Sequence, residues 1–282
     1  LGFTAEASHF DLSAAKPASA TRAAPTWALD EQTGQLTKIG GIPLAGPQLM
    51  LLPLNNAGET QMQGKTKVWE PFTAPCAGWK SEKVTKDAAT GITTVTGTYD
   101  DAKGTYQIRT DGSNLSIAYD FEVIKAVSPR QVGLVFTLPP EYESLAWQRV
   151  GYWNVYPEDH IARLVGSVKA SEGHEATSVG PRDKPAHPWR LDNLPFGNND
   201  FCSTKHNILT GSLADKNGNG VTIEGAGTQH LRAWKDAKGV HFLVADYSNG
   251  GSERFLRGLV GKEDRPLKPG NKITGTVKLR VK

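Results

Sequence analysis

Apolar and polar residues alternate strictly over several stretches of this chain, and this alternation constrains the fold more than any other feature. Between residues 115 and 123 every second residue is apolar, which places five side chains on one face of a β-strand. The same period recurs before Pro139 and Pro140, which end a strand by removing two N–H donors, and again near the C-terminus. The alternating residues are Leu115, Ile117, Tyr119, Phe121 and Val123; Val132, Leu134, Phe136 and Leu138; and Ile273, Val277, Leu279 and Val281. Because no segment carries a helical apolar stripe over about 12 residues, the sequence predicts an all-β protein.

Turn-forming sequences separate these apolar stretches. They contain Asp, Asn and Gly, which tolerate positive φ, and they recur roughly every 8–12 residues, as in a meandering antiparallel sheet. The expected turns are Asp101–Gly104, Asp111–Asn114, Asn217–Gly220 and Asp236–Gly239.

The composition changes along the chain of 282 residues. Residues 1–25 are rich in Ala, Ser and Thr and are expected to form a linker or an edge strand. Strand patterns fill about 26–145 and 200–282, which suits one large domain or two coupled halves. The segment 150–200 is irregular and dense in Pro, His, Trp and Asn, and a loop of that length in a compact domain is usually functional. The candidate site residues are therefore expected mainly there.

Charge and cysteine usage exclude several classes of protein. The net charge of +3 argues against a nucleic-acid binder, and no apolar run approaches the length of a transmembrane helix. Cys76 and Cys202 are too few for a disulfide framework; they either pair or remain two buried free thiols. The compartment stays open, with a periplasmic or secreted location slightly favoured.

The strongest concentration of chemically useful side chains lies between residues 147 and 160. Aromatic rings can cover the C–H face of a sugar, and carboxylate, amide and imidazole groups can bind its hydroxyls. The alternative is that Trp147 and Trp153 are ordinary core aromatics. The candidate carbohydrate contacts in this cluster are Trp153, Asn154, Tyr156, Glu158 and His160.

Catalysis finds less support in the sequence. Glu158 and His160 lie two residues apart, so a strand would present them as an acid/base pair or as a surface ion pair without function. The histidines show no metal-ligand spacing, no nucleotide-binding or nucleophile motif is present, and no pair of carboxylates is selected for glycoside hydrolysis. We expect no metal, no cofactor and no catalytic residue in this chain.

Several motifs resemble, in order and spacing, the C-terminal supersandwich domain of family 2 glycoside hydrolases, the β-galactosidase-like enzymes. The segment 27–39 resembles the opening strand, turn and strand of that domain, and Gly46–Leu49 resembles its G-P-x-L motif. Gly151, Tyr156 and Pro157 match a G-P-x-E-N-Y-P-D-R segment, in which Asn154, Val155 and Asp159 replace the family's Glu, Asn and Arg. A later match covers Asn199–Lys205.

The resemblance implies one large two-sheet antiparallel supersandwich over residues 26–282, a galactose mutarotase-like fold. In the family the catalytic glutamates belong to a preceding TIM barrel, so the expected function is a non-catalytic, carbohydrate-binding or cleft-completing domain with that barrel as partner. A chain that begins at Leu1 rather than Met fits this expectation. The family also places a Trp after a Gly-Gly pair at the sugar site, and Phe255 stands there in this chain. The alternatives are a free-standing mutarotase-like epimerase that uses Glu158 and His160, and a purely structural domain.

Overall fold

β-Strands account for most of the described residues, as the alternating sequence predicts. The computed structural model describes residues 24–53, 75–151, 164–171, 201, 204–248 and 265–282. Within these ranges fourteen strands follow in order: β1 (Trp27–Asp30), β2 (Gln35–Ile39), β3 (Ile42–Pro53), β4 (Lys80–Asp87), β5 (Ile92–Thr98), β6 (Ala102–Asp111), β7 (Asn114–Val123), β8 (Pro129–Leu138), β9 (Ser144–Arg149), β10 (Val165–Lys169), β11 (Lys205–Ala214), β12 (Gly220–Asp236), β13 (Gly239–Ser248) and β14 (Lys272–Val281).

The strands with the clearest alternation are confirmed. In β7 all five alternating apolar side chains are buried, and β8 ends at Leu138, directly before the two prolines. One expected turn is wrong: Ala102, Lys103 and Gly104 belong to β6. Gly104 is needed in that strand because a side chain there would overlap the backbone of Asp120 in β7.

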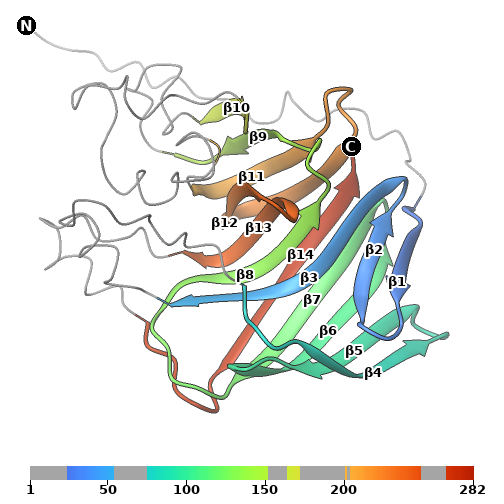
Figure 1. Ribbon diagram of the computed structural model, residues 1–282, viewed down its shortest axis with the longest axis vertical. Helices are drawn as coiled ribbons and strands as arrows, with labels where there is room; N and C mark the ends of the chain where they lie inside the picture. Colours follow the sequence, from blue (N-terminus) through green and yellow to red (C-terminus); the bar gives the residue numbers. More distant parts are fainter. Residues whose placement is uncertain (1–23, 54–74, 152–163, 172–200, 202–203, 249–264) are drawn as a thin grey trace, which may run out of the picture.

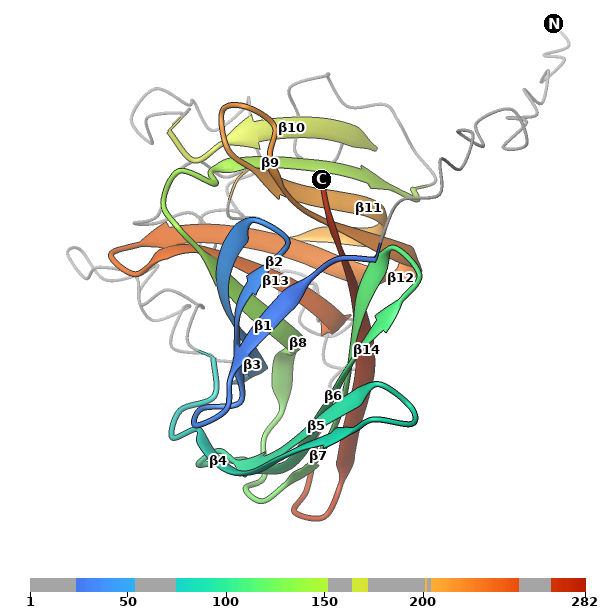
Figure 2. The ribbon, with the colours of Figure 1, turned by 90° about the vertical axis from the view of Figure 1, so that its right-hand side faces the viewer.

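The strands form an antiparallel sheet that curls on itself. The strand order is β1-β2-β3-β8-β13-β12-β14-β7-β6-β5-β4, and Figures 1 and 2 show β1–β3 on one side facing β4–β7 on the other. Contacts across the curl join these two ends. The indole N–H of Trp79 donates to the carbonyl oxygen of Thr33 at 2.8 Å, and Lys86 pairs with Glu31 at 2.6 Å. The chain is therefore an all-β protein built as an antiparallel two-layered structure, as predicted.

Three further strands extend the sheet beside β12. β11 pairs with β12 and with β9, and β9 also pairs with β10; Figure 2 shows them together at one end of the molecule. β10 thus lies inside the segment expected to be irregular. Trp147 in β9 is 3% exposed, with Lys205 Nζ 4.5 Å from the centre of its ring. Trp147 is therefore a core aromatic rather than a sugar platform.

A cluster of aromatic rings fills the space between the layers. Trp79 contacts Tyr99, with ring centres 4.6 Å apart, and the hydroxyls of Tyr99 and Tyr106 hydrogen-bond at 2.7 Å. The backbone N–H of Leu49 in β3 donates to Tyr99 Oη at 3.0 Å, so one buried hydroxyl ties the two layers together. Burial also raises the pKa of the nearby Cys76 thiol to about 12. Cys202 lies outside the described residues, and its pairing stays a prediction.

Candidate functional site

Irregular backbone gathers where β11, β12 and β13 meet. The first part of β12 pairs with β14 and the second with β13, and between them lies the stretch Gly225–Gln229, with Gly227 at a φ of 81°. The β11–β12 ladder shifts register on both sides of Ile208, and the β13–β8 ladder shifts between Ala245 and Tyr247. Shifts of this kind leave a residue unpaired and redirect its side chain, and they are common beside functional sites.

A cavity of about 540 Å³ opens at this place. Its size lies within the usual range for small-molecule sites. We call it the Asp246 cavity; it is lined by Asn207, Gly227, Thr228, His230, Asp246, Tyr247, Ser248 and Arg265.

Asp246 occupies the register shift of β13, and its carboxylate is held from both sides. Tyr119 Oη donates to Oδ2 at 2.7 Å, and Gln229 Nε2 donates to Oδ1 at 2.8 Å. Burial raises the pKa of Asp246 above its usual value, although both hydrogen bonds oppose the rise. A half-buried carboxyl with a raised pKa holds a proton more readily than an exposed one, which suits a group that accepts and returns protons.

Gly275 in β14 makes room for this carboxylate. A Cβ at position 275 would overlap Asp246 Oδ2 and would crowd the ring of Tyr119. The placement of Asp246 therefore depends on a missing side chain two strands away as well as on its own hydrogen-bond donors.

Two histidines face one another at the wall of the cavity. His206 Nδ1 and His230 Nδ1 are 3.1 Å apart, and the ring centres lie 4.7 Å apart. Burial lowers the pKa of His206 to about 3, helped by the positive charges of His230, Arg149 and Lys205. Burial lowers the pKa of His230 to about 4. Both imidazoles are therefore neutral at pH 7.

Hydroxyl, amide and guanidinium groups complete the lining. Gln131, which is 1% exposed, donates from Nε2 to Thr204 Oγ1 at 2.9 Å and to Ser248 Oγ at 3.2 Å. Because Ser248 Oγ accepts that bond, its own O–H can donate elsewhere. At the rim the guanidinium of Arg265 lies 5.0 Å from the centre of the Tyr247 ring. The cavity thus combines a carboxylate acceptor with imidazole, hydroxyl and guanidinium groups.

All six residues selected from the sequence lie outside the described residues. They belong to the stretches 152–163 and 249–264, so their contacts are not described: Trp153, Asn154, Tyr156, Glu158, His160 and Phe255. The described residues that flank these stretches do approach the cavity. The backbone N–H of Val150 donates to the carbonyl oxygen of Asn207 at 2.8 Å, and Ser248 and Arg265 line the cavity themselves.

Asp246, His206 and His230 were not selected from the sequence. Two signals point to their position in retrospect. The apolar run of β13 ends in the polar triplet Asp246–Ser248, and a Gly-Ala-Gly sequence interrupts the pattern of β12, which suggests a bulge.

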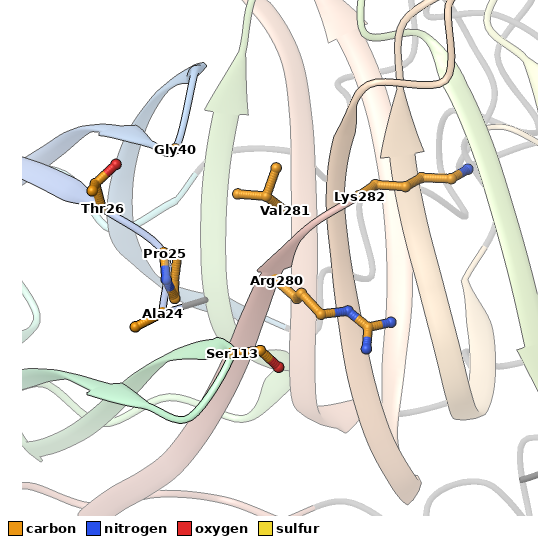
Figure 3. Close-up of a pocket in the computed structure, with 8 residues that line it drawn as sticks. All are labelled: Ala24, Pro25, Thr26, Gly40, Ser113, Arg280, Val281 and Lys282. Atoms are coloured by element: carbon orange, nitrogen blue, oxygen red, sulfur yellow. The ribbon is translucent and has the colours of Figure 1, made fainter. Parts of the chain in front are cut away.

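A second hollow, shown in Figure 3, lies between β1 and the end of β14. It has a volume of about 360 Å³, and we call it the Arg280 cleft. Arg280 Nη1 pairs with Glu224 Oε1 at 2.6 Å, and the cleft lining includes no carboxylate or imidazole side chain. Its lining residues are Ala24, Pro25, Thr26, Gly40, Ser113, Arg280, Val281 and Lys282.

Within the described ranges, no group of three or more His, Cys, Asp or Glu side chains is placed to hold a metal ion. No helix in that same part of the chain is long and apolar enough to cross a membrane.

The sequence comparisons give no relative. No protein-family model matches the chain, and no curated protein matches it.

Solved structures that resemble this chain include galactose mutarotase-like proteins and a glycosidase domain. A galactose mutarotase-like protein from Lactobacillus casei ATCC 334 is 10% identical, with 93% of this chain and 98% of that chain covered and a TM-score of 0.45. A putative aldose 1-epimerase from Escherichia coli K12 is 10% identical, with 92% and 96% covered and a TM-score of 0.43. The galactosidase domain of an alpha-galactosidase-sucrose kinase is 10% identical over 92% of this chain and 30% of that chain, with a TM-score of 0.38.

Proposed function

We propose that the chain binds carbohydrate in the Asp246 cavity. The observation that carries this proposal is the composition of one hollow of about 540 Å³: a held carboxylate lies beside a neutral imidazole and a serine hydroxyl. A sugar ring offers hydroxyl groups that both donate and accept hydrogen bonds, so a site with both kinds of partner suits it.

Residues of the sequence-selected cluster are proposed to contribute to the same site. Trp153 and Tyr156 would cover a sugar face, and Asn154, Glu158 and His160 would bind hydroxyls; Phe255 would add a third ring. Support comes from the flanking residues, since Val150 bonds to Asn207 and both Ser248 and Arg265 line the cavity.

We further propose that the chain serves as an accessory, cleft-completing domain of a β-galactosidase-like glycoside hydrolase, beside a TIM barrel. The support is the ordered set of motifs that resembles the C-terminal domain of family 2 enzymes. The nucleotide sequence on either side of the coding region tests this part, because an adjoining TIM barrel in the same reading frame would support it. An adjoining stop codon and an ordinary start would contradict it.

Isothermal titration tests carbohydrate binding directly. Galactose, glucose, rhamnose and plant oligosaccharides are titrated into the chain, and we expect heat of binding for at least one of them. The matched control is Arg280→Gln, a change in the Arg280 cleft that should leave the heat unchanged. Absence of heat with every sugar would contradict carbohydrate binding and would leave a purely structural domain.

A second candidate function is proton transfer at the anomeric centre of a sugar, favoured by the shifted pKa values of Asp246 and His230. The carboxylate would accept the proton of the anomeric hydroxyl as the bond between C1 and the ring oxygen breaks. The neutral His230 N–H would stabilise the developing charge on the ring oxygen by a hydrogen bond, and the proton held by Asp246 would reach that oxygen through water, giving the open-chain aldehyde. Polarimetry of freshly dissolved α-galactose tests this reading. A rate above that of buffer favours an epimerase, and binding without acceleration favours the accessory domain.

A further inference from the structure

His230 receives a hydrogen bond that fixes the position of its proton. The backbone N–H of Asn207 donates to His230 Nδ1 at 3.3 Å. A backbone amide nitrogen can only donate, so Nδ1 of His230 carries a lone pair whenever this bond is formed. Asn207, whose N–H makes this bond, has a φ of 59°. Asn tolerates this left-handed conformation better than most residues do.

The same reasoning assigns the proton of His206. Its Nδ1 lies 3.1 Å from His230 Nδ1, and two lone pairs at that distance would repel one another. His206 must therefore donate from Nδ1–H to the lone pair of His230. Such a bond requires the acceptor ring of His230 to be neutral, and burial together with the nearby positive charges of Arg149, Lys205 and Arg130 disfavours protonation of His206.

A neutral imidazole with a lone pair on Nδ1 carries its proton on Nε2. Among the described residues no partner is bonded to Nε2 of His230, and the ring lines the Asp246 cavity. We infer that His206 is a positioning residue which, together with the Asn207 backbone, holds His230 as the Nε2–H tautomer and so gives the cavity an N–H donor.

This inference deepens the proposed function, on which its ligand part rests. An N–H donor at His230 and acceptor oxygens at Asp246 require a ligand that offers both an acceptor oxygen and a hydroxyl donor. A neutral sugar meets this requirement. A sugar acid meets it less well at His230 and Asp246, because its carboxylate would approach the carboxylate of Asp246 there, while the guanidinium of Arg265 lies at the rim. The substrate class is therefore a neutral pyranose rather than a uronic acid.

Nuclear magnetic resonance of the free chain tests the tautomer without any sugar. Long-range ¹⁵N–¹H spectra of protein with ¹⁵N-labelled histidine distinguish Nδ1–H from Nε2–H rings, and we expect His230 as Nε2–H at pH 7. His206→Leu removes the shorter of the two bonds to His230 Nδ1 and leaves the 3.3 Å bond from Asn207, which we expect to be too weak alone to hold a single tautomer. His206→Asn keeps an N–H near the Nδ1 position and should restore the single form, and Lys86→Gln is the remote control.

Two results would overturn the inference. One is an Nδ1–H ring at His230 in the unchanged protein; the other is an unchanged His230 spectrum in a folded His206→Leu variant. If His206→Leu does not fold, His206→Asn decides the matter, because a folded Asn variant with mixed tautomers would contradict the role of His206.

Titration with neutral sugars and their uronic acids separates this inference from the proposed function. We expect His206→Leu to weaken binding of a neutral sugar roughly tenfold, His206→Asn to restore it, and galacturonate to bind less tightly than galactose. Equal affinities for His206→Leu and the unchanged protein would contradict the ligand part. If no sugar binds although His230 is held as Nε2–H, the proposed function fails and the positioning role of His206 stands.

Discussion

The Asp246 cavity and the Arg280 cleft lie in the same curled sheet, but their walls are made differently. The cavity lies where two ladders, β11–β12 and β13–β8, shift register. These shifts bring the carboxylate of Asp246, whose pKa is raised, to the wall of the cavity. The cleft lies between the start of β1 and the end of β14, it has no carboxylate or imidazole side chain in its lining, and the charge of Arg280 is paired with Glu224. The difference is why we propose the interrupted ladders, rather than the size of a hollow, as the mark of the site in this molecule.

Acidification should distinguish the two hollows most strongly. The pKa values of His206 and His230 fall from the usual 6.5 to about 3 and about 4 on folding. Between these values and 6.5 the unfolded chain binds more protons than the folded chain, so the free energy of unfolding falls as the pH falls. We expect a slope of about 1–2 kcal/mol per pH unit between about pH 6.5 and pH 4.5, measured by urea unfolding.

Variants assign this slope to the cavity. His206→Leu should flatten the profile, whereas Arg280→Gln in the cleft should leave its shape unchanged. Asp246 acts in the opposite direction. Because its pKa is raised by folding, the folded chain binds more protons at this carboxyl than the unfolded chain does, so this group stabilises the folded protein as the pH falls. Asp246→Asn should therefore steepen the loss. A profile of equal slope in His206→Leu and the unchanged protein would refute this assignment.

The next largest effect is expected for the charge of Asp246. Asp246→Asn keeps the size of the side chain but replaces a carboxylate that sugar hydroxyls would bind. A hydrogen bond to a charged group contributes about 1.5–3 kcal/mol, which is roughly a tenfold to hundredfold change in affinity. Isothermal titration with the best sugar measures the change; an affinity within about twofold of the unchanged protein would place the sugar elsewhere.

Gly275 tests whether the cavity depends on the missing side chain in β14. Gly275→Ala places a methyl group against Asp246 and Tyr119, and overpacking of this kind costs about 1–3 kcal/mol. The matched control is Gly41→Ala, at a position with nothing within 4 Å of the added methyl group. Urea unfolding compares the two variants, and equal stabilities would contradict the tight fit around Asp246.

The regular strands and turns could be predicted from the sequence because they depend on residues that are near one another along the chain. The alternation in β7 requires only neighbours two residues apart, and the turn at Asp236–Gly239 joins adjacent strands. The boundary of β6 was missed because it depends on the backbone of Asp120 packing against Gly104, which no local pattern encodes.

The candidate site depends on residues that are distant in the sequence. Asp246 is held by Tyr119, 127 positions away, and by Gln229, 17 positions away, and His206 meets His230 across 24 positions. The sequence favours the aromatic cluster at residues 147–160 instead, because those residues are close together along the chain. The residues around Asp246 are brought together only by the fold. The cluster residues, Trp153 among them, remain predictions, and the described cavity gives them a place at which to be tested.

The smallest effect is expected in the Arg280 cleft. Arg280→Gln removes an ion pair with Glu224 whose side chains are 32% and 43% exposed. Water already screens such a pair, so the free energy of unfolding should change by less than about 1 kcal/mol and sugar affinity should not change. Urea unfolding at low and high salt measures the change in the free energy of unfolding, since an exposed ion pair contributes less as the salt concentration rises. If Arg280→Gln weakened sugar binding as much as Asp246→Asn, the cleft rather than the interrupted ladders would hold the ligand.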